Sequence, residues 1–393
     1  MKISGRVEGV EYAIRDIVES ARQVKARGVR MHYLNIGDPC QFGFQPPPNV
    51  LRAFADAVQG GRNQYADSEG LPELREAIAA REAAKGMDVT GDGVLVTNGV
   101  SEGLDMVVSS IVDPGDEVLL PGPYYPPYAS YVRLRGGVPV EFAADAGDGA
   151  PDPAEIRSLI TPRTVAICLI NPNNPTGTVI GGRRLRQILD VAGEHGLYVI
   201  CDEIYDRITY GGPFEGAGSV ARDLPVILLN GFSKVHMMTG WRLGYIAFNG
   251  SPGLGRIREH LPKLARVRIC GSTPAQHAAL ESLRGPQEHI TSMVSELQKR
   301  RDLAVRLLSE IPGITCRAPA GAFYAFPRID PSLGTDKEFV SGLLEETGVL
   351  AVHGSGFGER HGSGHFRIVF LPPEDYLEEA LGLVARYVNR STR

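Results

Sequence analysis

Short apolar runs alternating with segments of helical spacing constrain the fold of this chain more than any other feature. Helical spacing follows the first of these runs at 101–112 and the third at 183–194. Strands that are buried on both faces appear as continuous apolar runs, and helices are the usual connection between parallel strands. The sequence therefore predicts an α/β fold with a mainly parallel sheet covered by helices. The runs occupy residues 93–97, 117–120, 164–170, 198–201, 226–229 and 244–248.

The two ends of the chain have a different pattern. Residues 1–45 contain a short helical piece and a loop rich in Gly and Pro. A chain of 393 residues is long enough for about two domains. We therefore expect a large domain at 46–286 and a smaller α+β domain formed by both ends, 1–45 and 287–393. Towards the C-terminus, helical spacing occurs at 287–310, 335–346 and 374–389, and a strand pattern occurs at 365–370.

The composition excludes several classes of partner. Hydrophobic residues make up 43% and charged residues 22%, and the net charge of −5 comes from acidic and basic residues mixed along the chain, so no nucleic-acid surface is indicated. No signal-peptide pattern follows Met1, and no stretch approaches about 18 uninterrupted apolar residues, so we expect no membrane insertion. The five cysteines are scattered without a C-x-x-C pair, which fits a reducing cytoplasm.

Lys234 follows a predicted buried strand, where lysine is unusual because its ammonium group is normally solvated. One interpretation is a loop lysine at a strand end. The other is chemical, since a lysine held in a pocket loses its proton and condenses with an aldehyde as a Schiff base. Pyridoxal 5'-phosphate (PLP) is such an aldehyde, and Arg242, eight residues later, would supply a cation for its phosphate.

The residues around Lys234 resemble the cofactor-lysine signature of the class I and II aminotransferases, which are PLP enzymes of fold type I. The resemblance implies that Lys234 carries PLP, that Ser233 lies beside it at the cofactor, and that Arg242 binds the phosphate. Many members have serine three residues before the lysine; this chain has Gly231, which leaves one phosphate contact open. The matching stretches are Asn230-Gly231-Phe232-Ser233-Lys234 and Thr239-Gly240-Trp241-Arg242-Leu243-Gly244-Tyr245.

Two further polar stretches follow predicted strands, where ligands of open α/β sheets bind. Asn174 lies in a Pro- and Asn-rich stretch that by itself indicates a plain turn, and Asp202 by itself could equally be a helix N-cap. The family resemblance implies that Asn174 holds the ring hydroxyl of PLP and the substrate, that Asp202 faces the pyridine nitrogen, and that Tyr205 bonds the ring oxygen. An anion at that nitrogen keeps the ring protonated, so that it accepts electrons effectively.

The same resemblance implies the remaining cofactor contacts. Gly99, Val100 and Ser101 form a glycine turn into a predicted helix, whose free N–H groups would bind the phosphate. Tyr125 matches the aromatic residue that stacks on the pyridine ring, although a plain surface loop is the alternative. Tyr65 matches a tyrosine that reaches the phosphate of the neighbouring subunit, which implies a homodimer with shared active sites.

Three residues are candidates for substrate binding. The resemblance places the arginine for the substrate α-carboxylate at Arg367, where bidentate pairing suits an amino acid, and a backbone contact at Gly37. Arg15, within an apolar helical turn, is our candidate for the distal carboxylate of a substrate such as glutamate; a surface pairing with Asp16 or Glu11 is the alternative. The chain is most similar to the alanine aminotransferase branch, through residues 34–39, 42–44, 268–270 and 274–278.

The resemblance covers nearly the whole chain and predicts transamination between an L-amino acid of the alanine or glutamate type and a 2-oxo acid. The same scaffold also hosts lyases and synthases. A serine hydrolase is a third hypothesis, because 99–103 fits the G-x-S-x-G pattern at Ser101 and His353, His361 and His365 lie downstream. This hypothesis leaves the lysine and carboxylate motifs unexplained.

A binding protein is the last alternative. The glycine-rich stretch 354–358 is not a G-x-G-x-x-G turn leading into a helix, so dinucleotide binding is not expected. The three histidines of the same region lack the spacing of metal ligands, so we expect no metal site.

Overall fold

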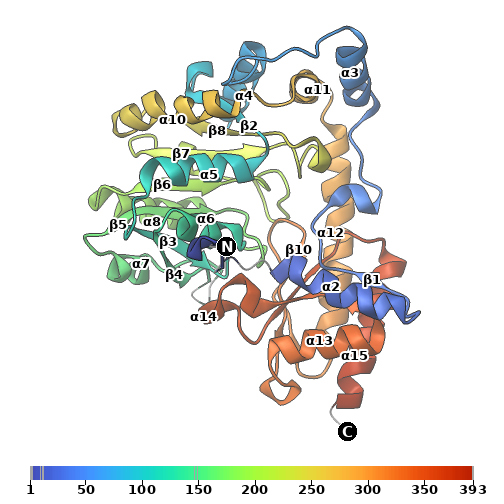
Figure 1. The fold of residues 1–393 in the computed structure, drawn as a ribbon. Coiled ribbons are helices and arrows are strands. Elements are labelled where there is room, and N and C mark those ends of the chain that lie inside the picture. The colour runs from blue at the N-terminus through green and yellow to red at the C-terminus, as the bar shows by residue number, and fades with distance from the viewer. Residues whose placement is uncertain (1–2, 9, 11–12, 146, 148, 392–393) are drawn as a thin grey trace.

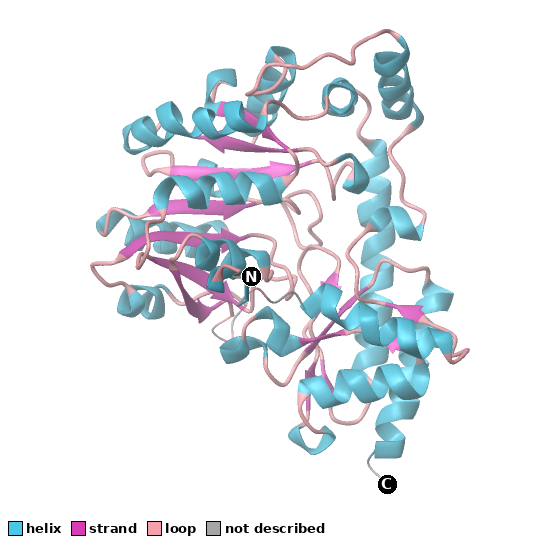
Figure 2. Cartoon of the chain, viewed as in Figure 1, coloured by secondary structure: helices cyan, strands magenta, loops and turns pink. Residues whose placement is uncertain are grey.

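The computed structural model describes residues 3–8, 10, 13–145, 147 and 149–391 of the chain. Within them, the main feature is a seven-stranded sheet, whose strands are among the magenta arrows of Figure 2. The strand order in this sheet is β2-β8-β7-β6-β5-β3-β4. Neighbouring strands run parallel except at β8, which is antiparallel to both β2 and β7. The predicted mainly parallel sheet is confirmed. The strands are β2 (Val94–Thr97), β3 (Glu117–Gly122), β4 (Val138–Ala143), β5 (Thr164–Ile170), β6 (Tyr198–Asp202), β7 (Val226–Gly231) and β8 (Gly244–Phe248).

Helices cover both faces of this sheet (Figure 1). Strand β5 shows why, because its alternate side chains enter two different cores. Ala166, Cys168 and Ile170 pack in one hydrophobic cluster, and Ile167 and Leu169 pack in another on the opposite face. The first cluster includes side chains of α5 (Val100–Ile111), α6 (Pro127–Leu134) and α10 (Gly255–Arg268), and the second those of α7 (Pro153–Leu159), α8 (Gly182–Glu194) and α9 (Ala217–Val220).

Three further helices pack beside β2 and β8, in a part of the chain for which the sequence pattern predicted no element. They are α3 (Pro48–Gln59), α4 (Pro72–Ala84) and α11 (Thr273–Arg284). Leu74 and Ile78 of α4 share a cluster with Val96 of β2 and Ala247 of β8. Each fully buried aliphatic side chain of this kind contributes about 1.5–3 kcal/mol to folding.

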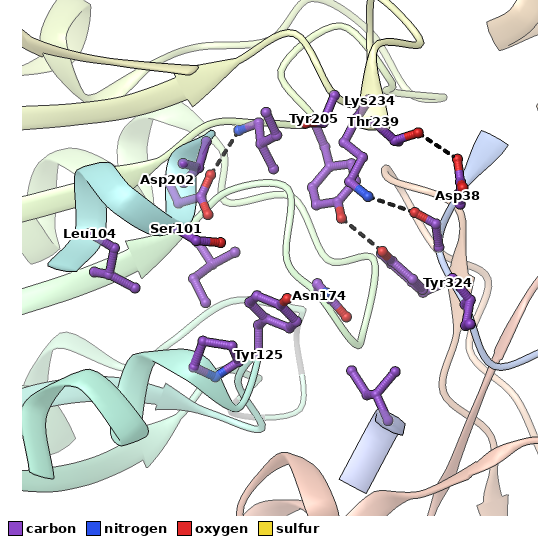
Figure 3. Close-up of a pocket in the computed structure, with 18 of the residues that line it drawn as sticks. Asp38, Ser101, Leu104, Tyr125, Asn174, Asp202, Tyr205, Lys234, Thr239 and Tyr324 are labelled. Atoms are coloured by element: carbon purple, nitrogen blue, oxygen red, sulfur yellow. Dashed lines mark hydrogen bonds between the residues drawn. The ribbon is translucent and has the colours of Figure 1, made fainter. Parts of the chain in front are cut away.

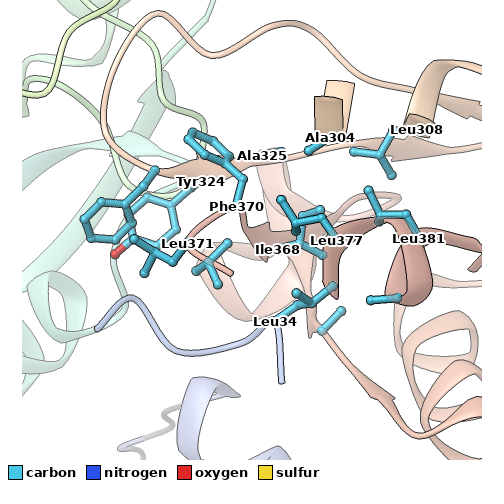
Figure 4. Close-up of a cluster of buried hydrophobic side chains, with 14 of the residues drawn as sticks. Leu34, Ala304, Leu308, Tyr324, Ala325, Ile368, Phe370, Leu371, Leu377 and Leu381 are labelled. Atoms are coloured by element: carbon cyan, nitrogen blue, oxygen red, sulfur yellow. The ribbon is translucent and has the colours of Figure 1, made fainter. Parts of the chain in front are cut away.

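A smaller group of elements is built from both ends of the chain. Strand β1 (His32–Tyr33) pairs in parallel with β12 (Val349–Leu350), and Leu34 packs with Ile368 and Leu377 in one core (Figure 4). The exact boundaries at 45/46 and 286/287 stay a prediction. The other strands are β9 (Ile314–Thr315), β10 (Tyr324–Ala325), β11 (Arg328–Ile329), β13 (Val352–His353) and β14 (Phe366–Val369), and the helices are α2 (Ala13–Ala26), α12 (Glu288–Ser309), α13 (Asp336–Thr347), α14 (Glu359–Gly362) and α15 (Glu374–Ser391). Helix α1 (Gly5–Glu8) instead contacts α6 of the large sheet unit (Figure 1).

Helix α13 illustrates how local sequence sets the ends of these helices. Thr335 accepts a hydrogen bond from the backbone N–H of Glu338, whose carboxylate accepts in return from the backbone N–H of Thr335. This capping box satisfies N–H groups that have no partner within the helix. Gly348 ends the helix with a φ of 73°, a left-handed conformation that glycine adopts without strain.

The strand directions concentrate polar residues at one edge of the large sheet. Strands β2, β5, β6 and β7 all end there, because they run parallel. Strand β8 is antiparallel and therefore begins at the same edge, directly after Arg242 and Leu243. In the described part of the chain, no helix has both the length and the apolar character needed to cross a membrane.

Candidate active site

A cavity of about 550 Å³ lies at this edge, between the ends of the sheet strands and the smaller group of elements (Figure 3). Its lining comes from the loops after β5, β6 and β7, from the start of α5, from the N-terminal segment after β1, and from β10 and β14. Most of the predicted site residues therefore meet in one place. Those that line the cavity are Gly37, Val100, Ser101, Tyr125, Asn174, Asp202, Tyr205, Ser233, Lys234, Arg242 and Arg367.

Lys234 is half-buried in the cavity wall, and its amine donates a 2.6 Å hydrogen bond to the backbone carbonyl of Gly37. Burial lowers the pKa of Lys234 to about 8; nearby Asp38 opposes this shift, and the positive charges of Arg367 and Arg242 add to it. With this pKa, roughly a tenth of the amine is neutral at pH 7, far more than for a solvated lysine. A neutral lysine amine in a pocket is a nucleophile and a base.

Asp202, the last residue of β6, is buried beside the same cavity. Its carboxylate accepts a 2.6 Å bond from the hydroxyl of Tyr128 and a 2.9 Å bond from the backbone N–H of Ile204. Burial raises the pKa of Asp202 to about 6, and the two hydrogen bonds oppose that shift. The residue thus has the backbone contact of a cap and also faces the cavity, where a cation beside it would stabilise its negative charge.

Two phenols meet in the wall of the cavity. The hydroxyl of Tyr205 lies 2.8 Å from that of Tyr324, and their rings pack edge to face with centroids 5.7 Å apart. Burial raises the pKa of Tyr205, and the neighbouring phenol contributes to the same shift. Tyr205 therefore stays protonated and can donate a hydrogen bond.

Arg367 comes from β14 and is 1% exposed. Its guanidinium donates a 2.9 Å bond to the side-chain oxygen of Asn174 and a second bond to the backbone carbonyl of Asn35. The guanidinium carbon also lies 4.6 Å from the ring centroid of Tyr324 and 4.7 Å from that of Phe357. These contacts orient a planar double donor towards the cavity, and a carboxylate is the natural ligand for such a group.

The start of α5 and the side chain of Arg242 form a basic corner of the cavity. Gly99 precedes the helix with a φ of 82°, and no side chain caps the helix N-terminus. A Cβ atom on Gly99 would lie 2.4 Å from Nη2 of Arg242, and one on Gly244 would lie 2.7 Å from the backbone nitrogen of Val100. The open N–H groups and the guanidinium are thus close together, which favours binding of an anion such as phosphate.

The structure explains why glycine occupies position 231. A Cβ atom on Gly231 would lie 2.8 Å from the Cα atom of Gly244, the first residue of the neighbouring strand β8, and 2.9 Å from the backbone oxygen of Leu243, which precedes it. A serine would not fit there without moving the backbone. Gly231 also does not contribute to the cavity lining.

Three predicted site residues do not belong to the described cavity lining. Gly99 lies directly before Val100, which does line the cavity, at the start of α5. Tyr65 is 77% exposed on the surface of the single chain. The side chain of Arg15 lies outside the described part of the structure, although its neighbour Ile14 on α2 lines the cavity. Their proposed roles stay predictions.

Several lining residues were missed from the sequence. Asp38 accepts a 2.8 Å bond from the hydroxyl of Thr239, which ties the N-terminal segment to the loop after Lys234. Tyr128 lies in the first turn of α6, and its backbone N–H donates a 3.1 Å bond to the carbonyl of Tyr125, which precedes the helix. Tyr324 had no signal in the local sequence, because its position depends on the pairing of β10 with β14.

The histidines required for a serine hydrolase lie elsewhere. No histidine belongs to the described lining of the cavity that contains Ser101. His353 instead contacts the hydroxyl of Ser355 at 2.9 Å, and the ring of His365 stacks on Phe326. Over the described residues, no three His, Cys, Asp or Glu side chains gather as metal ligands.

Comparison with known proteins agrees with this geometry. The family model described as "Aminotransferase class I and II" matches residues 30–383. An alanine aminotransferase of Mycobacterium tuberculosis is 38% identical over 94% of this chain and 88% of its own length, and a glutamate-pyruvate aminotransferase of Escherichia coli is 37% identical over 98% and 97%.

Solved structures support the same relationship. The structure of an alanine aminotransferase from Pyrococcus furiosus covers 99% of this chain and 100% of its own, with 48% identity and a TM-score of 0.96. An aminotransferase from Escherichia coli has a TM-score of 0.94 at 36% identity, and the coverage is 99% of this chain and 98% of that one. These neighbours confirm the fold and the family expected from the sequence.

Proposed function

We propose, from the premise that the chain belongs to the class I and II aminotransferase family, that its cavity binds PLP through Lys234. Membership of this family makes the chain an aminotransferase, an enzyme that moves an amino group between an amino acid and a 2-oxo acid. The observation that carries the proposal is a half-buried lysine with a lowered pKa in a cavity that Asp202 and Arg367 also line.

The residues present fit the chemical groups of PLP. The uncapped start of α5 and the guanidinium of Arg242 form an anionic site for the phosphate. Asp202 can face the pyridine nitrogen, and Tyr205 can donate to the ring oxygen. The ring of Tyr125, also in the lining, is available for stacking. The phosphate, the ring nitrogen, the ring oxygen and the aromatic face of PLP thus each have a suitable binding group in one cavity.

In the proposed mechanism, the chain positions the substrate and moves one proton. When bound, PLP supplies an aldehyde carbon that condenses with amines and a ring that accepts electrons from the Cα–H bond. Arg367 and Asn174 hold the substrate α-carboxylate and so orient that bond. Lys234, once its amine is free, would accept the proton from Cα of the substrate and deliver it to the carbon that the aldehyde of PLP supplies. Asp202 keeps a positive charge favoured at the ring nitrogen.

We propose an amino donor of the alanine or glutamate type. Relatives at 37–38% identity are named alanine aminotransferase and glutamate-pyruvate aminotransferase. Among the described lining residues, the basic side chains are Lys234, Arg242 and Arg367, and all three already have roles. Alanine needs no further cation, whereas glutamate needs one for its distal carboxylate. Arg15 on α2 remains our candidate for that group.

A homodimer in the cytoplasm is part of the same proposal. The 77% exposure of Tyr65 leaves its phenol available to a neighbouring subunit, as the family resemblance implies. In that arrangement each active site would take Tyr65 from the partner subunit and Lys234 from its own.

The test is a screen of amino donors and 2-oxo acids with the purified protein, combined with a Lys234→Ala variant. The unsubstituted protein should bind PLP with a visible absorbance band and transaminate alanine or glutamate. Lys234→Ala should lose both the band and multiple-turnover activity, while Lys299→Ala, at an exposed helix position, should keep both. Substantial multiple-turnover transamination by Lys234→Ala would refute the assignment of Lys234, and elimination or condensation products would indicate a PLP lyase or synthase instead.

A further inference from the structure

Tyr324, which lies outside the sequence motifs, contacts two functional residues of the cavity. Tyr324 lies in β10, is 2% exposed, and points its hydroxyl towards that of Tyr205 at 2.8 Å (Figure 3). The same ring lies beneath the guanidinium of Arg367, with 4.6 Å between the guanidinium carbon and the ring centroid. Tyr324 therefore contacts both the residue proposed for the ring oxygen of the cofactor and the one proposed for the substrate carboxylate.

The position of Tyr324 is set by its surroundings. Strand β10 pairs with β14, which carries Arg367, and Tyr324 is opposite Val369 in this pairing. On the cavity side, a Cβ atom on Gly37 would lie only 2.2 Å from the hydroxyl oxygen of Tyr324, so the phenol packs directly against the Gly37 backbone. The hydroxyl thus has little room to move away from Tyr205.

The hydroxyl pair has a directional consequence. A phenol has one proton, so Tyr205 cannot donate to Tyr324 and to a ligand at the same time. If an electronegative oxygen occupies the cavity beside Tyr205, the favourable arrangement is for Tyr324 to donate to Tyr205 and for Tyr205 to donate to that oxygen. Hydrogen bonds arranged in such a chain polarise and strengthen one another.

We propose that Tyr324 is a positioning residue whose hydroxyl donates to Tyr205 and directs the Tyr205 proton at the cofactor ring oxygen, while its ring supports the guanidinium of Arg367. This inference rests on the proposed function, because it assumes PLP in the cavity. The two contacts are separable: phenylalanine at 324 removes the hydroxyl but keeps the aromatic face for the guanidinium. Leucine removes both.

The first test is a pH titration of the visible absorbance of the PLP-loaded protein. The band changes when the proton shared by the lysine nitrogen and the ring oxygen leaves, and a donor at that oxygen favours the deprotonated form. Tyr324→Phe should therefore raise the titration midpoint by about 0.3–1 pH unit, as expected for one neutral hydrogen bond. Tyr205→Phe should raise it further, and the affinity of the Tyr324→Phe apoprotein for PLP should fall roughly two- to ten-fold.

The double variant decides whether the effect passes through Tyr205. In the Tyr205→Phe background, Tyr324→Phe should add no further shift, because the residue that transmits it is absent. Equal and additive shifts in both backgrounds would overturn the proposal. Tyr210→Phe is the matched control, since it also removes one phenol bond, a 2.6 Å bond to the carbonyl of Ala322, but Tyr210 does not line the cavity.

Steady-state kinetics test the contact with Arg367. Tyr324→Phe should leave KM for the amino donor nearly unchanged, and Tyr324→Leu should raise it several-fold. If the unsubstituted protein binds PLP and its band titrates, an unshifted midpoint in Tyr324→Phe would refute the role of Tyr324 but leave the proposed function intact. Absence of any visible PLP band in the unsubstituted protein would refute the proposed function together with this inference.

Discussion

The amine of Lys234 donates its 2.6 Å hydrogen bond to the carbonyl of Gly37, a residue almost 200 positions earlier in the chain. A second contact, from the hydroxyl of Thr239 to the carboxylate of Asp38, ties the same two segments together. The lysine loop of the large sheet is therefore held against the N-terminal segment that passes over the cavity. This arrangement buries the lysine and places a carboxylate near it, and both effects act on its protonation.

The pKa of Lys234 predicts how cofactor loading depends on pH. Because condensation requires the neutral amine and burial lowers the pKa to about 8, the rate of PLP uptake by the apoprotein should rise about tenfold for each pH unit below 8 and level off above it. Asp38 raises this pKa, so Asp38→Asn should move the midpoint to lower pH while keeping the amide oxygen as an acceptor. Stopped-flow absorbance at a series of pH values measures both. A midpoint near 10.5, as for a solvated lysine, would contradict the prediction.

Asp202 should matter through its charge and Tyr128 through one hydrogen bond. Asp202→Asn keeps the shape but removes the anion from a buried site, at a cost of about 3–5 kcal/mol, so kcat should fall by roughly two to four orders of magnitude. Tyr128→Phe removes the 2.6 Å bond to the carboxylate of Asp202 and should lower kcat about tenfold. Circular dichroism should show both variants folded. An unchanged kcat in Asp202→Asn would show that Asp202 serves only as a structural acceptor for Tyr128 and the backbone N–H of Ile204.

Restoring the family serine at position 231 should be harmful here. The new Cβ atom would meet the backbone of Gly244 at 2.8 Å, so Gly231→Ser should lower the free energy of unfolding by about 1–3 kcal/mol without tightening PLP binding. Gly211→Ser, where an added Cβ meets nothing within 4 Å, is the control. Thermal unfolding of the two variants in parallel checks the difference. A Gly231→Ser protein that is more stable and binds PLP more tightly would contradict the prediction, because it would mean that β7 and β8 move apart without cost to admit the side chain.

Hybrid dimers can test whether Tyr65 acts across a subunit interface. Mixing Tyr65→Phe chains with Lys234→Ala chains gives dimers in which one site has both defects and the other has neither, provided that Tyr65 serves the partner's site. Activity should then exceed that of the Tyr65→Phe parent. Recovery of no activity above that parent would place Tyr65 outside the partner's active site.

Arg15 can be tested by substrate selectivity. Loss of a charge-assisted bond costs about 1.5–3 kcal/mol, so Arg15→Ala should lower kcat/KM for glutamate roughly ten- to a hundred-fold and affect alanine much less. Arg22→Ala on the same helix removes an exposed arginine that pairs with Glu19 and should change neither. Equal losses for both amino acids, or none, would remove Arg15 from the substrate site.

The central strands of the sheet were predictable, because strands buried on both faces appear in the sequence as continuous apolar runs. The run at 164–170 corresponds to β5 residue for residue, since the side chains of this central parallel strand after Thr164 pack in a core on one face or the other. Strand β4 was missed, because it lies at the edge of the sheet and its side chains are mostly half-exposed. The 14-residue helix α2 was predicted only as a short helical piece.

For the site, the sequence determined which residues end or follow the strands, and hence that Lys234, Asp202 and Asn174 would meet at one edge. Their spacing along the chain is sufficient for this, because parallel strands carry their carboxyl ends to the same side. Only the tertiary structure decided the rest. The pairing of β10 with β14 brings Tyr324 to Tyr205, and the close approach of β8 to β7 requires glycine at 231. The lowered pKa of Lys234 likewise depends on burial by segments distant in sequence, and desolvation is a property of the assembled cavity that no local pattern contains.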